Sequence, residues 1–151
     1  MPRSYSVVGD QTVASATDTC LTIQSATTIR PELFYIAFSC LTDELDDMLR
    51  WTVQRFDTDD GTGSAVTPNA LLDGYPASLA TVLDNHTVEP SSYLAGEIPL
   101  DIGVNTRSSF QWYAQPGRPI NLPAIATEGV GFQPVHASST PAVICCVHFD
   151  E

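Results

Sequence analysis

Three histidines, His86, His136 and His148, are the residues of this sequence best suited to metal binding or general acid–base chemistry. Such chemistry needs two or more of them to converge with a carboxylate, because a metal ion or a proton relay requires several donors in one place. Their spacing shows none of the close repetition of metal-binding motifs. We therefore expect satisfied or exposed histidines, with no metal ligand and no catalytic residue among them.

Four cysteines, Cys20, Cys40, Cys145 and Cys146, could act as nucleophiles, metal ligands or disulfide partners. All four lie in apolar strand patterns, which favour inert buried thiols over an electropositive reactive cleft. Their number is even, but the absence of a small, loop-rich scaffold favours reduced thiols over disulfides. Cys145 and Cys146 are adjacent on an expected strand, so their side chains should point to opposite faces.

The acidic stretch 57–63, which contains Asp57 and Asp60, has a spacing similar to that of the oxygen-ligand loops that bind calcium. An EF-hand loop requires glycine at its sixth position and a bidentate glutamate at its twelfth. Thr62 and Pro68 occupy these places here. We interpret the stretch as a solvated loop, and the sequence predicts no metal and no cofactor.

The sequence predicts a non-enzymatic protein, since it contains no nucleophile elbow, phosphate-binding loop, dinucleotide fingerprint or Cys-x-x-Cys pair. Its formal net charge is −12, with six arginines, no lysine and 18 acidic residues. This charge argues against nucleic acid, which requires clustered basic residues, and against an anionic membrane. No apolar run approaches the roughly 18 residues of a spanning helix, and the amino terminus lacks a signal-peptide pattern.

Strands must position any surface that the protein uses, and the clearest strand is predicted over 48–56. There Trp51 and its aliphatic neighbours alternate with polar residues, which is the pattern of a half-buried strand. The stretch 109–114 has the same pattern around Trp112 and is the best candidate for its partner. Two tryptophans that face one interior would anchor the packing of a β-sandwich.

Two further predicted strands, 33–40 and 142–149, are apolar on both faces. In the first, strict alternation puts Phe34 and Phe38 on one face and Tyr35 on the other. A strand of this kind is either central in the fold or covered by a neighbouring subunit. For 33–40 the sequence leaves both alternatives open, whereas the carboxyl-terminal strand 142–149 is expected in the middle of a sheet.

The chain predicts an all-β, single-domain antiparallel β-sandwich over 1–151, with an extended N-terminal arm over 1–18. Its 11 prolines and 9 glycines suit many turns, and about eight or nine strands fit a jelly-roll or Greek-key order. One short helix is expected over 76–83, where Pro76 opens a stretch of apolar residues at helical spacing. Such a helix would plug one open end of the sandwich.

Several segments of the chain resemble a family of small phage and prophage virion structural proteins. They are ATTIRP at 26–31, WTVQRF at 51–56, DGYPASLAT at 73–81, IPL at 98–100, RSSFQW at 107–112, PG at 116–117 and FDE at 149–151. The most specific role that this resemblance implies is that of a capsid cement, or decoration, protein. Such a protein would be made in the cytoplasm of the host bacterium and, as a homotrimer, bind the major capsid protein on the outside of the virion shell.

A protein with this role must present contact residues to its partners. Aromatic residues are candidates for a buried contact with a neighbouring subunit or the capsid. The alternative interpretation is that each of them packs in the ordinary core of the protein. Arginines are candidates for contact with an acidic capsid surface. The alternative interpretation is that each of them is an ordinary solvated charge. The six candidate contact residues are Arg3, Arg30, Phe34, Tyr35, Phe38 and Tyr113.

A second function is open to a sandwich of this size. It could be a tail-associated receptor- or carbohydrate-binding module, in which exposed aromatic rings line a shallow groove. Tyr75, Tyr93 and Trp112 are the candidates for such a groove, and the alternative would lose its best residue if Trp112 were buried.

Overall fold

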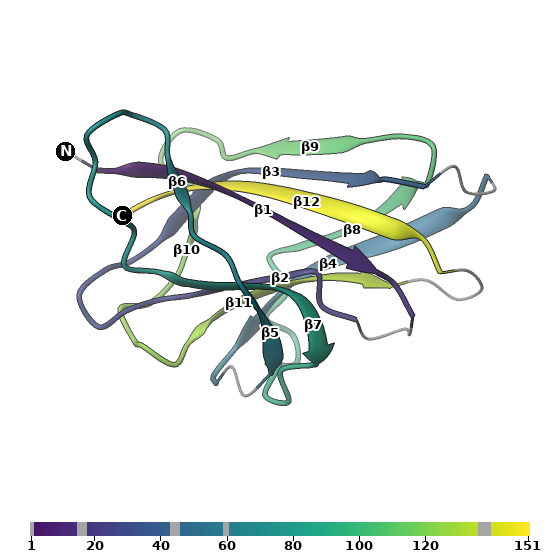
Figure 1. Cartoon of the computed structure of the whole chain (residues 1–151), viewed down its shortest axis with the longest axis horizontal. Helices are drawn as coiled ribbons and strands as arrows, with labels where there is room; N and C mark the ends of the chain where they lie inside the picture. The colour runs from purple at the N-terminus through teal and green to yellow at the C-terminus, as the bar shows by residue number, and fades with distance from the viewer. Residues whose placement is uncertain (1, 15–17, 43–45, 59–60, 136–139) are drawn as a thin grey trace.

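The structure is a computed structural model of the chain, and it describes residues 2–14, 18–42, 46–58, 61–135 and 140–151. Two antiparallel sheets of six strands each stack as the layers of a β-sandwich (Figure 1). The described residues form no helix. Among them there is accordingly no helix long and apolar enough to cross a membrane. The expected all-β sandwich is confirmed, whereas the predicted eight or nine strands fall short of the twelve observed.

The first sheet, sheet A, has the strand order β10-β3-β12-β1-β6, and β9 pairs with β3 beside β10. Its strands are β1 (Ser4–Thr12), β3 (Glu32–Cys40), β6 (Asn69–Ala70), β9 (Phe110–Tyr113), β10 (Ile120–Asn121) and β12 (Ala142–Asp150). The carboxyl-terminal strand β12 pairs along its length with both β1 and β3. Its apolar pattern on two faces therefore belongs to a strand in the middle of the sheet.

The second sheet, sheet B, has the order β5-β7-β2-β11-β4-β8. Its strands are β2 (Leu21–Gln24), β4 (Met48–Phe56), β5 (Thr62–Ala65), β7 (Thr81–Val88), β8 (Leu100–Asn105) and β11 (Gly129–Val135). β4 has the predicted bounds and pairs with β11 and β8, whereas its expected partner β9 belongs to sheet A. Two strands with the same alternation can pair side by side or face each other across a core, so the pattern alone could not separate these arrangements.

The two sheets meet through the rings of Phe38 from β3 and Trp51 from β4. Their centroids are 4.2 Å apart, with 9° between the ring planes, and each side chain is 1% exposed. Trp112 of β9 packs against the same core, so both tryptophans face one interior as predicted. A stacked pair adds about 0.5–1.5 kcal/mol to the stabilisation that comes from its buried area.

The short helix expected over 76–83 does not form, because Val82 is buried in strand β7 instead. Just before that strand, the carboxylate of Glu151 accepts hydrogen bonds from the backbone N–H groups of Leu79 and Ala80, each at 3.1 Å. Two turns of helix are only marginally stable on their own. Strand pairing and these tertiary hydrogen bonds therefore outweigh the helical spacing.

The segment between β4 and β8 joins the two layers along one side of the sandwich. β5 and β7 extend sheet B beyond β2, while β6 pairs with β1 at the edge of sheet A. Figure 1 shows this segment crossing between the layers close to both chain termini. Residues 4–12 of the expected N-terminal arm accordingly form strand β1, held between β12 and β6.

Candidate docking surface

A β-bulge in strand β3 builds the candidate site. Tyr35 pairs with His148 of β12 and Leu33 pairs with Phe149, so that Phe34 is an extra residue between the two pairs. A bulge of this kind interrupts strict alternation and can re-aim a side chain. Phe34 and Tyr35 are consecutive, yet both rings pack against the ring of His148, while Leu33 is fully buried.

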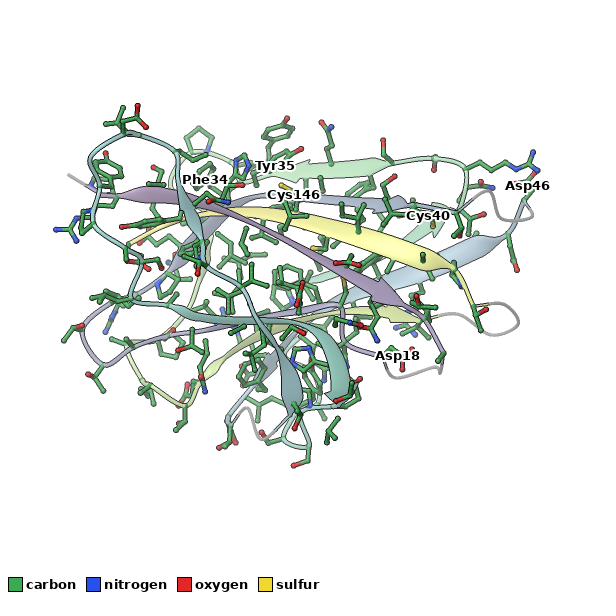
Figure 2. The ribbon with its side chains drawn as sticks, viewed as in Figure 1. Asp18, Phe34, Tyr35, Cys40, Asp46 and Cys146 are labelled. Atoms are coloured by element: carbon green, nitrogen blue, oxygen red, sulfur yellow. The ribbon has the colours of Figure 1, made fainter. Side chains whose placement is uncertain are left out.

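Four rings from three neighbouring strands gather on the outer face of sheet A. This outer aromatic cluster consists of Phe34, Tyr35, Tyr113 and His148, and Phe34 and Tyr35 are labelled side by side in Figure 2. The ring centroid of Tyr35 lies 4.9 Å from that of Tyr113 and 4.7 Å from that of His148. Phe34 packs edge-on against His148, with 5.9 Å between centroids. Because Tyr113 is 64% exposed, the cluster presents an aromatic surface to solvent.

Three titratable groups of this surface, His148, Tyr35 and Cys146, favour their uncharged forms. Burial lowers the pKa of His148 below its usual value of 6.5. Burial, followed by the neighbouring Tyr113, raises the pKa of Tyr35. Burial also raises the pKa of Cys146, whose sulfur lies 3.8 Å from Nε2 of His148. Each shift disfavours the charged form, as removal from water does, so the outer aromatic cluster is an apolar, neutral patch near neutral pH.

A pocket of about 230 Å³ adjoins the outer aromatic cluster at Phe34. Two carboxylates line it, Glu32 from β3 and Asp150 from β12, and these residues lie directly opposite each other across the strand pair. Asp150 accepts a hydrogen bond of 2.6 Å from the hydroxyl of Ser4. The pocket thus places an acidic pair beside an aromatic ring.

A tight turn over 115–118 also lines the pocket. The backbone N–H of Arg118 donates to the carbonyl of Gln115 at 2.9 Å, and Gly117 has a φ of 74°. That φ is favourable for glycine alone, which explains the Pro-Gly pair at the centre of the turn. The residues that this segment contributes to the pocket are Ala114, Gln115, Pro116, Gly117 and Pro119.

Three of the predicted contact residues, Phe34, Tyr35 and Tyr113, therefore meet in one surface cluster. Phe38 does not reach the surface, because it is 1% exposed and stacked on Trp51 in the core. The expectation that Phe34 and Phe38 share a face is wrong, since the bulge shifts the alternation of β3 between them.

Neither of the two arginines singled out by the sequence belongs to the cluster or lines its pocket. Arg3 is exposed beside the chain termini, where its backbone pairs with that of Glu151. Arg30 lines a separate cleft of about 330 Å³ together with Arg55, whose Nε lies 3.9 Å from a carboxylate oxygen of Glu97. A contact through Arg30 would thus use a different cleft from the pocket beside Phe34.

The side chains considered for chemistry do not converge. His86 is buried with its Nε2 3.4 Å from the hydroxyl of Thr22, and His148 belongs to the outer aromatic cluster. His136 and the acidic positions 59–60 lie outside the described residues. Over the ranges that the structure describes, no group of three potential metal ligands occurs.

All four cysteines are present as thiols. Cys20 and Cys145 are buried, and burial raises the pKa of both, which favours the unreactive protonated form. Cys40 and Cys146 are half-buried. The burial of Cys145 beside the half-exposed Cys146 confirms that these neighbours point to opposite faces of β12.

A larger cleft of about 640 Å³ lies at the end of β3 nearest Cys40, against the turn between β8 and β9. Its lining is rich in hydroxyl groups and contains no aromatic ring: Ser39, Cys40, Thr42, Thr106, Arg107, Ser108 and Ser109. It offers hydrogen bonds but little apolar contact, and apolar contact is what most ligand and partner sites require. The outer aromatic cluster is therefore the stronger candidate.

Sequence reasoning missed four residues of this site, Glu32, Cys146, His148 and Asp150. Three of them, Cys146, His148 and Asp150, lie on strand β12. The alternation along that strand does distinguish them from its buried residues. The missing information was the lateral pairing of β12 with β3, which brings His148 beside Tyr35. That pairing joins segments more than a hundred residues apart, and no local pattern reports it.

Comparison of the chain with protein-family models, curated proteins and solved structures found no match. The fold and the site together define a β-sandwich with a neutral aromatic patch on one outer face.

Proposed function

We propose that the protein is a non-enzymatic virion structural protein, a capsid cement or decoration protein that binds the outside of the major capsid protein shell and stabilises it. The outer aromatic cluster carries this proposal. Aromatic residues are enriched at protein interfaces, and tyrosine is prominent among the residues that dominate binding energy. Tyr113, which is 64% exposed, would be the central contact of the docked face.

The strand order supports a jelly roll as the finer description of this sandwich. Eight of the strands form two four-stranded sets, β1-β12-β3-β9 and β2-β11-β4-β8. If these eight are numbered in chain order, the sets read 1-8-3-6 and 2-7-4-5, the arrangement of a jelly roll, with β5, β6, β7 and β10 as additions. Jelly rolls are common in viral capsid and lectin domains, although a fold alone does not determine a function.

The resemblance to small phage virion proteins supports the same role. Its segments fall on structural positions in both layers, since 51–56 lies in β4 and 107–112 leads into β9. The segment 73–81 forms the crossing between the layers that the Glu151 carboxylate holds. These matches concern packing and turns, so they support the type of fold, while the outer aromatic cluster supports the contact.

A homotrimer on the shell is the assembly that we expect. The outward positions along the two central strands of sheet A are only half-buried in a single subunit, and they are largely apolar: Tyr35, Ala37, Ile144 and Cys146. Contact with a second subunit or with the capsid would remove this apolar surface from water, which favours association.

Light scattering of the purified protein, followed by co-sedimentation with capsids stripped of it, tests the proposal. We expect a trimer that binds the stripped shells stoichiometrically. Tyr113→Ala should weaken shell binding about tenfold or more, as the loss of a hot-spot tyrosine does. Val88→Ala, at a position 54% exposed on sheet B, should leave binding unchanged. A monomer that ignores the shells would overturn the proposal.

A tail-associated receptor- or carbohydrate-binding module is the alternative, but the rings expected to form its groove are engaged elsewhere. The Tyr93 hydroxyl shares a hydrogen bond of 2.9 Å with Thr19, and its ring packs edge-on against Phe56. Tyr75 packs beside β1, and Trp112 packs against the core. Glycan binding by a protein that ignores capsids would favour this alternative.

A further inference from the structure

We propose that the pocket beside Phe34 binds an arginine side chain presented by the protein partner. This inference rests on the proposed function, because it supposes that a protein docks on the outer face of sheet A. Glu32 and Asp150 provide two carboxylates at the pocket, and the ring of Phe34 provides an aromatic wall. A guanidinium group is the side-chain group that matches both features.

In the described part of the chain, the acidic pair has no basic side chain paired with it to balance its charge. Glu32 and Asp150 are directly opposed on β3 and β12, and like charges at opposed positions destabilise a sheet. Among the described residues neither carboxylate makes an ion pair, and Arg50 and Arg55 of β4 pair with other acids. Arg118, in the neighbouring turn, pairs with neither of them. An incoming cation would pair with both carboxylates at once, which favours a cationic group as the ligand of this pocket.

The aromatic wall distinguishes arginine from other cations. A guanidinium is planar, stacks on aromatic faces and forms paired hydrogen bonds with carboxylates, whereas lysine carries a compact, strongly hydrated charge. Phe34 stands in the pocket wall because the bulge turns it there, and its ring is supported by His148. Tyr35 and Tyr113 continue the aromatic surface toward the rest of the docked face.

Backbone hydrogen bonds hold the pocket in shape before any ligand arrives. The N–H of Ala114 donates to the carbonyl of Phe34 at 2.9 Å, which fixes the start of the turn against β3. The bond from Arg118 to Gln115 closes the turn itself. A preformed pocket binds more tightly because little conformational entropy is lost on binding.

Charge complementarity favours a basic partner over a neutral glycan. The protein carries a formal net charge of −12, which attracts a surface that bears arginines and speeds its approach. A sugar could use the rings and the amide of Gln115, but it would leave Glu32 and Asp150 without a cationic partner.

Titration of the whole protein with N-acetyl-arginine methylamide, followed by NMR at constant ionic strength, tests the inference. We expect saturable binding with a Kd in the millimolar range, with shifts centred on Phe34 and Asp150. The citrulline counterpart has the same shape without the charge and should bind about tenfold more weakly. Equal binding of the two probes, no saturable binding, or stronger binding of methyl glucoside would each overturn the inference.

Variants separate a specific pocket from general acidity. Glu32→Gln should weaken arginine binding about tenfold, and Phe34→Leu, which keeps an apolar side chain but removes the ring, should weaken it several-fold. Asp73→Asn removes one exposed acid outside the pocket and should have no effect. If Asp73→Asn weakened binding as much as Glu32→Gln, the pocket would have no specific role.

The same variants distinguish failure of this inference from failure of the capsid role. Shell binding that Glu32→Gln leaves unchanged would overturn the arginine pocket and leave the proposed function intact. Binding of the arginine probe by a protein that ignores the stripped shells would overturn the capsid role and support the pocket.

Discussion

The outer faces of the two sheets differ in the contacts that their side chains make: hydrogen bonds on sheet B and ring packing on sheet A. On sheet B, Arg50 donates two hydrogen bonds to the carboxylate of Asp101, at 2.8 and 2.6 Å. Beside them, the hydroxyl of Thr52 donates to the amide oxygen of Gln133 at 3.2 Å. On sheet A, the corresponding central positions carry aromatic rings that pack on one another and on Cys146.

Sheet B is also covered by its own chain. The ring of Tyr93 lies over Gly131 of β11, and the side-chain amide of Gln54 donates to the carbonyl of Leu94 at 3.0 Å. The outer aromatic cluster of sheet A instead ends in Tyr113, which is 64% exposed. The polar side chains on the outer face of sheet B are thus bonded within the subunit, while the outer face of sheet A leaves apolar surface exposed to water.

The first prediction contrasts the inner and outer faces of sheet A. Phe38→Ala should lower the free energy of unfolding by about 3–5 kcal/mol, because it removes a buried ring stacked on Trp51. Tyr113→Ala, on the outer face, should cost under about 1 kcal/mol while it weakens docking. Urea denaturation measures both losses, and similar losses for the two variants would contradict the division into a core face and a docking face.

The second prediction removes the cover from sheet B. A Cβ at position 131 would overlap the phenol oxygen of Tyr93, so Gly131→Ala should displace that ring and cost about 1–3 kcal/mol. Gly103→Ala is the matched control on the same sheet, since its Cβ would meet only the flexible side chain of Met48. Thermal unfolding compares the two, and an unchanged Tm for Gly131→Ala would show that the Tyr93 contact is dispensable.

The third and smallest prediction concerns pH. The pKa of His148 is lowered in the folded protein, so its neutral form is favoured and the unfolded chain binds the proton more readily. The resulting stability is fully present above the ordinary pKa of 6.5 and is lost as the pH falls through the lower folded pKa. We expect a loss of under about 1 kcal/mol between about pH 7.5 and about pH 5.

His148→Gln should flatten this pH dependence, measured as the urea midpoint across the range. Asp101→Asn on sheet B should leave it unchanged, because Arg50 lowers the pKa of Asp101 and its contribution is lost only in more acidic solution. If the urea midpoint of His148→Gln kept the same pH dependence, that dependence would come from a group other than His148.

Strand patterns predicted much of the layered architecture. β4 has the bounds expected from the alternation around Trp51, and β12 is central, as its two apolar faces indicated. The short strands β5 and β6 were not predicted, since exposed small and polar residues carry no alternation signal. The prediction of a helix over 76–83 was wrong. A short apolar run at helical spacing also fits a strand with one buried side chain, which here is Val82 of β7.

The sequence by itself determined the all-β character of the chain, its acidic surface and the burial of Trp51, because these follow from residue type and local period. Only the tertiary structure decided the site. A bulge that places Phe34 and Tyr35 together against His148 exists only relative to the partner strand. The same pairing sets Glu32 opposite Asp150, more than a hundred residues away, and such register arises from the packing of the whole sandwich.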